Sequence, residues 1–186
     1  DQARSKGAKG DGFDRLEKRL SSLGVIINHS SEVQYPTEEQ LQSLIDLYSG
    51  DQLQKALTST LKLIEKFPKS AVLHNICGAV NASLKEFDNA IEAYKMAIVI
   101  KPDYAEAYYN MGAAHQDQGY FNDALDAYEK AIAIQPDYAD AHNNMGNVLK
   151  EQGKLDDAIE AYKKVIAIKP DYAEAYYNMG NTLQDQ

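Results

Sequence analysis

Hydrophobic side chains recur at intervals of three and four residues along most of the chain, which is the spacing of one face of an α-helix. Between residues 105 and 138 they form two such stretches separated by a short polar turn. The first stretch contains Tyr108, Met111, Ala114 and His115, and the second contains Phe121, Ala124, Tyr128, Ala131 and Ile132. The pattern predicts two helices that pack together through their hydrophobic faces.

The two-helix pattern repeats at a fixed period, and Pro-Asp-Tyr triplets end three successive units at Tyr104, Tyr138 and Tyr172. Units 105–138 and 139–172 are identical at 18 of 34 positions. Residues 173–186 match the start of unit 105–138 at 11 of 14 positions. Self-similarity at a fixed period of this length is typical of repeat proteins, in which stacked units share a continuous core.

Turn and capping residues predict where the helices begin and end. Gly119 and Gly153 are expected to end first helices, because glycine adopts the left-handed conformation without strain. Pro136 and Pro170 should prevent continuation of the second helices into the next unit. Carboxylate or amide side chains near each helix start are expected to cap the free amides. The predicted caps are Asp103, Asp137 and Asp171 for first helices, and Asn122 and Asp156 for second helices.

The repeating unit resembles the tetratricopeptide repeat (TPR), whose signature combines an aromatic residue, a glycine, an alanine, a second aromatic residue and a proline. In unit 105–138 these positions are filled by Tyr108, Met111-Gly112, Gly119, Ala124, Tyr128, Ala131 and Pro136. The resemblance covers residues 71–186 and implies an all-α fold, a right-handed superhelical solenoid of antiparallel helix hairpins. It also implies that the hairpins pack most closely at three glycines, with alanines facing them. The glycines are Gly112, Gly146 and Gly180, and the facing alanines are Ala124 and Ala158.

The repeat register divides the chain into seven segments. They are a disordered lead at 1–12, a short amphipathic helix and linker at 13–36, a degenerate N-terminal repeat at 37–70, repeats at 71–104, 105–138 and 139–172, and the first helix of a truncated repeat at 173–186. The helix at 13–36 is expected to dock on the first repeat, with a partner or a membrane surface as the alternative. In the degenerate repeat, Thr37 and Gln40 form a capping box, whereas Leu44 replaces the contact glycine.

Composition excludes several classes of protein. The net charge is -9, which disfavours binding to a nucleic-acid backbone. No apolar run approaches the roughly 18 residues that a transmembrane helix needs. The single cysteine, Cys77, permits no internal disulfide and no cysteine-based metal site, so a reducing, cytoplasmic location is expected. The chain begins at Asp1 without a methionine and stops within a repeat, which indicates a piece of a longer protein.

Candidate catalytic groups recur with the repeat instead of converging on one place. His74 and His142 occupy the same repeat position as Tyr108 and Tyr176, so we interpret these histidines as packing residues. Cys77 stands where other repeats have methionine, which favours a core role. We therefore expect no enzyme active site and no cofactor within this segment.

The inner face of the first helices is the expected binding surface. In TPR proteins the second, fifth, sixth, ninth, twelfth and thirteenth positions of each unit face a concave groove, and the resemblance places asparagines and tyrosines there. The candidate groove residues are Asn75, Tyr109, Asn110, Gln116, Asn143, Asn144, Asn147, Lys150, Tyr177, Asn178 and Asn181. Carboxamides both donate and accept hydrogen bonds, so such a ladder can pair with the backbone of an extended peptide. It resembles the asparagine ladder in the repeat domain of O-linked N-acetylglucosamine transferases.

These features predict a non-catalytic module that binds a protein or peptide. TPR domains that bind acidic chaperone tails use lysine and arginine in the groove, whereas this chain has acidic residues and asparagine there, so a neutral or basic partner is expected. Three alternatives stay open: the asparagines are surface residues copied by duplication; the segment is the substrate-recognition region of a larger glycosyltransferase-like or sulfotransferase-like enzyme; or the half repeat drives head-to-tail self-assembly of a scaffold.

Overall fold

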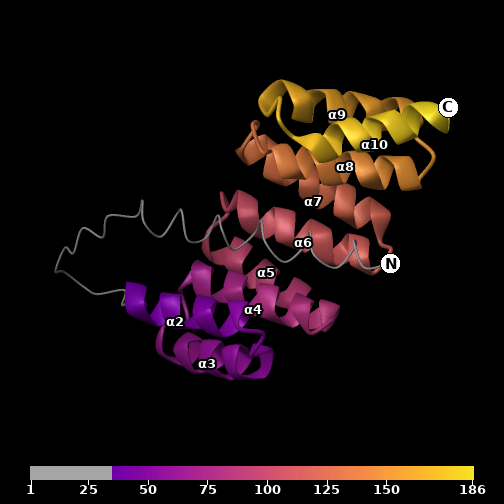
Figure 1. The fold of residues 1–186 in the computed structure, drawn as a ribbon. Helices are drawn as coiled ribbons and strands as arrows, with labels where there is room; N and C mark the ends of the chain where they lie inside the picture. The colour runs from indigo at the N-terminus through magenta and orange to yellow at the C-terminus, as the bar shows by residue number, and fades with distance from the viewer. Residues whose placement is uncertain (1–34) are drawn as a thin grey trace. The chain divides into compact units, whose positions relative to one another are not determined.

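A computed structural model of the protein describes residues 35–186, all of whose regular elements are α-helices (Figure 1). The prediction of an all-α fold is therefore confirmed. The chain divides after Pro68 into two compact units, which we describe separately. The lead predicted at 1–12 and nearly all of the helix and linker predicted at 13–36 lie outside the described residues.

The described part of the first unit, residues 35–68, contains the helices α2 (Glu38–Ser49) and α3 (Leu53–Lys66). The capping box predicted at its start is present. The Thr37 hydroxyl accepts a hydrogen bond from the Gln40 amide at 3.2 Å, and the Gln40 side chain accepts one from the Thr37 amide at 2.9 Å. Leu44 is buried in this hairpin, at the position where the later repeats have glycine.

The second unit is a series of helices that alternate in direction. They are α4 (Ala71–Ser83), α5 (Phe87–Ile100), α6 (Ala105–Asp117), α7 (Phe121–Ile134), α8 (Ala139–Glu151), α9 (Leu155–Ile168) and α10 (Ala173–Gln184). Each helix packs against the next, and the first helices α4, α6, α8 and α10 also contact one another in sequence. Successive second helices α5, α7 and α9 contact one another less. The first helices therefore form the inner side of this stack, and the second helices form its outer side.

A tyrosine ring packed against a glycine joins the two helices of each hairpin in the second unit. A Cβ atom added to Gly112 would lie 2.7 Å from Tyr128 Cε1, and one added to Gly146 would lie 2.6 Å from Tyr162 Cε1. The Ala124 carbonyl oxygen would lie 3.2 Å from the same Cβ atom at Gly112, so Ala124 faces this glycine as the sequence predicts. At Gly146 the three nearest atoms all belong to the Tyr162 ring.

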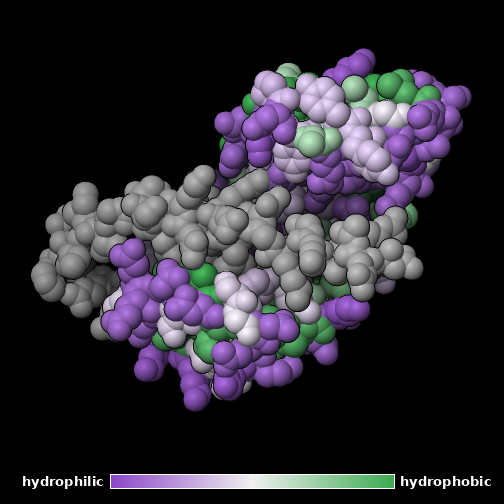
Figure 2. Space-filling model, viewed as in Figure 1, coloured by the Kyte–Doolittle hydropathy of each residue, from purple (hydrophilic) through white to green (hydrophobic). Residues whose placement is uncertain are grey.

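The visible surface is mostly hydrophilic, in keeping with the net charge of -9 (Figure 2). Large hydrophobic side chains that remain exposed in the second unit include Met96, Val99, Tyr120, Tyr176, Tyr177 and Leu183. Among residues 35–186, no helix is long and apolar enough to cross a membrane.

The predicted side-chain caps of the repeats are wrong. Tyr104, Tyr138 and Tyr172 are the N-cap residues of α6, α8 and α10, and none makes a side-chain capping bond. The aspartates lie one residue earlier, where a tight backbone turn already satisfies the first amides. The Ala105 amide, for example, donates to the Asp103 carbonyl oxygen at 3.2 Å.

The second helices also begin without the predicted caps. Asn122 and Asp156 lie inside α7 and α9, after N-cap residues that make no side-chain capping bond. Their side chains instead accept hydrogen bonds from Gln152 and Gln186 of the following repeat. The polar positions were identified correctly, but they join neighbouring repeats instead of capping their own helix.

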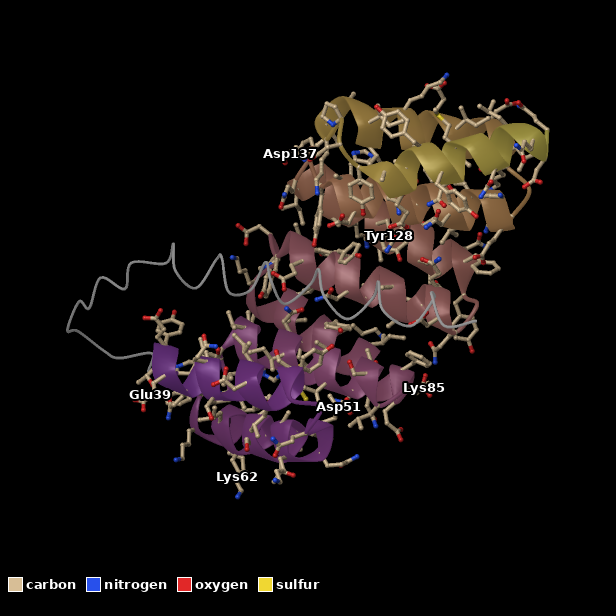
Figure 3. All side chains as sticks on the ribbon, in the orientation of Figure 1. Glu39, Asp51, Lys62, Lys85, Tyr128 and Asp137 are labelled. Carbon is tan, nitrogen blue, oxygen red and sulfur yellow. The ribbon has the colours of Figure 1, made fainter. Side chains whose placement is uncertain are left out.

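The turn inside each hairpin has the predicted left-handed conformation, with φ of +79° at Gly119 and +75° at Gly153. The earlier repeats adopt the same conformation without glycine. Lys85 has φ of +63° and Asp51 has φ of +58°, and they hold the position of Gly119 in the two preceding repeats (Figure 3). These two side chains are therefore held in a conformation that favours glycine.

Replacing Lys85 with glycine should stabilise the protein by about 0.5–1 kcal/mol, because it relieves this backbone strain. The measurement is the urea midpoint of unfolding followed by circular dichroism. Lys85→Ala is the matched control and should give no such gain, since alanine keeps the Cβ atom. Equal stabilisation by alanine would show that charge removal, and not φ, is the cause.

Gly146→Ala should destabilise the protein by about 1–3 kcal/mol, because the new methyl group overlaps the Tyr162 ring. Gly180→Ala is the matched control, since nothing lies within 4 Å of a Cβ atom at Gly180. There the greater helix propensity of alanine should stabilise by about 0.5–1 kcal/mol. Thermal unfolding of both variants measures the difference in sign, and two effects of the same sign would contradict the packing argument.

Candidate functional site

All the candidate groove residues lie on the first helices α4, α6, α8 and α10, but they differ in exposure. Asn75 and Asn143 are only 1% exposed, so their side chains are part of the interior. Tyr177 is 70% exposed. The remaining candidates are half-buried, namely Tyr109, Asn110, Gln116, Asn144, Asn147, Lys150, Asn178 and Asn181.

An asparagine at the sixth position of each repeat from residue 105 onward donates a hydrogen bond to the fifth position of the repeat before it. We call this bond the inter-repeat clip. It joins Asn110 Nδ2 to Asn75 Oδ1 at 3.1 Å, Asn144 Nδ2 to the Tyr109 hydroxyl at 3.2 Å, and Asn178 Nδ2 to Asn143 Oδ1 at 3.5 Å. Asn178 Nδ2 also donates to Asn147 Oδ1 of the same preceding repeat, at the shorter distance of 3.0 Å. Asparagines that the sequence suggested for peptide binding thus also hold consecutive repeats together.

Carboxylates at the second position of the repeats fix the direction of two clips. Asn75 Nδ2 donates to Glu106 Oε1 at 3.1 Å, and Glu106 is itself buried. A carboxylate only accepts hydrogen bonds, so the Asn75 amino group must face it and the Asn75 carbonyl must face Asn110. Asn143 Nδ2 donates to Glu174 Oε1 at 3.0 Å in the same way. These acidic residues therefore orient the buried asparagines.

The clips leave the carboxamide oxygens of the three donor asparagines available on the half-buried surface. Within residues 35–186, no side chain or backbone amide donates to Oδ1 of Asn110, Asn144 or Asn178. None of these oxygens is among the buried polar atoms that have no partner. The donor side of each carboxamide therefore points into the joint, and the acceptor side remains for a ligand.

Two buried tyrosine hydroxyls orient further carboxamides on the inner side. Tyr128, which is labelled in Figure 3, donates to Gln116 Oε1 at 2.8 Å. Tyr162 donates to Asn147 Oδ1 at the same distance. Burial raises the pKa of Tyr128 well above its ordinary value and that of Tyr162 to about 12, so both remain protonated donors at neutral pH. The amino groups of Gln116 and Asn147 have no acceptor among the described residues. These two residues therefore offer donors where the clip asparagines offer acceptors.

The tyrosines at the fifth position occur in different environments. The ring of Tyr109 packs against Tyr128 and Tyr138, with centroid distances of 5.9 and 5.1 Å. Tyr177 holds the same position on α10 and is exposed. Tyr109 therefore contributes to the joint, whereas Tyr177 presents its ring at the surface.

Lys150, the basic residue among the candidates, forms an ion pair with Asp185 at 2.8 Å. The two residues lie near the ends of α8 and α10, so the pair spans two repeats. The neighbouring carboxylate offsets the lysine charge and reduces its ability to attract an anionic ligand.

A second set of inter-repeat bonds on the outer side was not found from the sequence. Glutamines at one repeat position donate to polar side chains of the preceding repeat. The pairs are Gln118 with Asp88 at 2.8 Å, Gln152 with Asn122 at 3.0 Å, and Gln186 with Asp156. The signal was a glutamine that recurs every 34 residues from Gln118 onward, together with a second repeat position that is always polar.

Titratable groups in the described part of the chain show no arrangement for catalysis. Burial raises the pKa of the Cys77 thiol, which therefore stays protonated and unreactive. Burial lowers the pKa of His115 and His142, so both imidazoles are mainly neutral at pH 7. Residues 35–186 contain no cluster of three or more histidine, cysteine or acidic side chains able to hold a metal ion.

The fold and the bonded joints define a helical-repeat protein. A family model described as TPR repeat matches residues 78–119, 117–153 and 146–186. These matches cover more than half of the chain, so the protein belongs to the TPR repeat family.

Solved structures show the same architecture. A crystal structure of MamA is 29% identical to the chain, with 82% of this chain and 86% of that one covered and a TM-score of 0.71. A second MamA structure is 30% identical over 80% and 83% of the two chains, with a TM-score of 0.69.

More distant structures show the fold alone. YrrB, titled a TPR protein with an unusual peptide-binding site, is 19% identical over 95% and 84%, with a TM-score of 0.65. The first TPR of Spaghetti (RPAP3), bound to the HSP90 peptide SRMEEVD, is 22% identical over 62% and 91%, with a TM-score of 0.60. No curated protein sequence matches the chain.

Replacing Asn75 with alanine should destabilise the protein by about 1–3 kcal/mol, because it removes a donor to the buried Glu106 and the acceptor of the Asn110 clip. Asn89→Ala is the control, since Asn89 is exposed on α5 and such surface changes stay within about 0.5 kcal/mol. Chemical unfolding of both variants gives the comparison. Equal stability of the two would mean that the buried bonds contribute nothing net.

Proposed function

We propose that the inner side of α4, α6, α8 and α10 holds an extended segment of a partner protein. The chain is a TPR protein-interaction module, a fold that is typically non-catalytic, and TPR neighbours of known structure bind peptides. The observation that carries the proposal is the fixed orientation of the half-buried carboxamides, with Asn110, Asn144 and Asn178 offering oxygens to a ligand.

An extended peptide is the ligand that suits this arrangement. Its backbone presents amides and carbonyls in alternation, whatever its side chains are. The oxygens of the clip asparagines accept from peptide amides, and the amino groups of Gln116 and Asn147 donate to peptide carbonyls. Because the carboxamides are already fixed by buried bonds, little side-chain entropy is lost on binding.

The residues of the predicted site take two different roles in this proposal. Asn75 and Asn143 are buried and orient their neighbours without touching the ligand. Tyr177 adds an exposed ring for apolar contact near α10, as aromatic residues commonly do at interfaces. Asn181 continues the ladder along α10.

The charges of the inner side favour a neutral or basic segment. Lys150 is paired with Asp185, and Asp117, Glu151 and Glu174 are exposed on the same first helices. The RPAP3 repeat domain binds SRMEEVD, a peptide with two glutamates and an aspartate. A segment of that kind would meet like charges here, which opposes binding.

Two other hypotheses use parts of the same surface. In the first, the groove selects substrates for a larger glycosyltransferase-like or sulfotransferase-like enzyme, and the bound segment is the substrate. In the second, the chain self-associates through α10, whose Tyr176, Tyr177 and Leu183 are 47%, 70% and 51% exposed. Identifying the segment that binds the groove distinguishes substrate selection for an enzyme from a scaffold without catalytic activity. Light scattering tests the second hypothesis, self-association through α10.

The test is a peptide-display selection on the full chain and on the triple variant Asn110→Ala, Asn144→Ala, Asn178→Ala. We expect extended peptides to be enriched by the natural protein and to bind the triple variant at least about 10-fold more weakly, because each lost hydrogen bond contributes about 0.5–1.5 kcal/mol. Circular dichroism and thermal unfolding establish that the variant remains folded at the temperature of the assay.

Asn122→Ala is the matched control, because it also removes an inter-repeat hydrogen bond, but on the outer side. It should bind the enriched peptides like the natural protein. Equal binding by the triple variant would overturn the groove. Enrichment of acidic peptides such as SRMEEVD would overturn the charge preference and leave the groove intact.

A further inference from the structure

The clip asparagines Asn110, Asn144 and Asn178 occupy the same position in three successive repeats, so their available oxygens recur with the spacing of the helices that carry them. These helices, α6, α8 and α10, contact one another in sequence (Figure 1). Helices in direct contact have axes about 8–10 Å apart. The inner side therefore offers three hydrogen-bond acceptors in a row, separated by about 8–10 Å.

This spacing distinguishes between the extended conformations of a peptide. In a β-strand, the amides on one side recur every second residue, so they lie about 6.7 Å and then about 13 Å apart. A polyproline II helix has three residues per turn and rises about 3.1 Å per residue, so every third amide lies on the same side at a spacing of about 9.3 Å. Of the two conformations, only polyproline II matches the spacing of the acceptors.

The direction of the clips decides which residues of such a helix can face the inner side. Each clip uses the amino group of its asparagine, so the carboxamide presents its oxygen to a ligand. An oxygen bonds only to a donor, so each contact residue of the ligand must carry a backbone N–H. Proline lacks this hydrogen, but its fixed φ of about -65° suits polyproline II. Proline is therefore excluded from the contact residues and favoured at the two residues between them.

We propose that the bound partner segment is a polyproline II helix in which every third residue is not proline and donates its backbone N–H to a clip asparagine. This inference rests on the groove proposed above and adds the conformation and the sequence rule of its ligand. A polyproline II backbone makes no internal hydrogen bonds, so these amides are free to bind. The partner is thus a proline-containing segment that is recognised through its backbone hydrogens.

The donors on the inner side accept the same ligand. The amino groups of Gln116 and Asn147 bond to carbonyl oxygens, which proline also carries. Asn147 Oδ1 accepts from the Tyr162 hydroxyl at 2.8 Å and from Asn178 Nδ2 at 3.0 Å, and these two bonds fix its carboxamide in one orientation. The donors therefore tolerate proline at every residue, and the acceptors alone impose the period of three.

The test compares two nine-residue peptides of identical composition, three alanines and six prolines, with capped ends. The first has alanine at its residues 1, 4 and 7, so all three alanine amides can meet the acceptors at once. The second has alanine at its residues 1, 5 and 9, so only one amide meets an acceptor in any register. Each is titrated into the full ¹⁵N-labelled chain, and the carboxamide signals of Asn110, Asn144 and Asn178 are followed by NMR.

We expect saturable shifts with the first peptide and binding about 5-fold weaker or more with the second, because two hydrogen bonds are lost. A third peptide, the first with N-methylalanine in place of each alanine, should bind about 10-fold more weakly or less, since it has no amide hydrogen at the contact residues. Equal affinity of the first two peptides would overturn the period of three. Equal affinity of the first and third would overturn the requirement for N–H.

The triple variant Asn110→Ala, Asn144→Ala, Asn178→Ala should lose the preference for the first peptide, whereas Asn122→Ala on the outer side should keep it. Asn144→Ala alone serves should the triple variant fail to fold. It leaves two acceptors and should narrow the ratio of affinities, and an unchanged ratio would contradict the inference.

Failure of this inference is distinguishable from failure of the groove. Binding of display-selected peptides without binding of either alanine–proline peptide would overturn the polyproline II rule and leave the groove intact. If neither kind of peptide binds, the groove is overturned and the rule with it.

Discussion

The contact between a tyrosine ring and a glycine backbone inside each hairpin of the second unit determines how the inner side is built. The ring crosses from the second helix to the first, and the missing Cβ of glycine lets it pass at van der Waals distance. In repeats 105–138 and 139–172 its hydroxyl then reaches the inner side, where Tyr128 bonds Gln116 and Tyr162 bonds Asn147. A packing contact in the core thus orients polar groups at the surface.

The direction of the hydrogen bonds between these repeats is set by carboxylates in the first turn of the first helices. Carboxylates at such positions are usually interpreted as helix-capping groups. Glu106 and Glu174 accept from Asn75 and Asn143, and these asparagines in turn accept from the next repeat. The direction of the Asn110 and Asn178 carboxamides is therefore set by a charged group two hydrogen bonds away. Such networks are stabilising when every member is satisfied, and they also define a single arrangement of the surface.

The sequence predicted the period, the helix pairs and the left-handed turns, because each depends on local residue types such as Gly119 and Gly153. It did not predict the roles of the polar residues. Asp103 and Asn122 have the chemistry of caps, but whether a side chain caps its own helix or bonds the next repeat depends on distances between repeats. The burial of Asn75 and Asn143 could not be predicted from the sequence for the same reason, since the fifth position is covered only when a following repeat packs over it.

Every clip has its donor in the later repeat and its acceptor in the earlier one. Repeats that follow this rule can therefore be joined in different orders. Any unit with asparagine at its sixth position can follow any unit with asparagine or tyrosine at its fifth, as the mixture of Asn75, Tyr109 and Asn143 acceptors shows. Gene duplication can therefore lengthen or reorder the array without a new joint having to evolve. The outer surface of each unit is then left to diverge, one residue at a time, while the assembly rule stays the same.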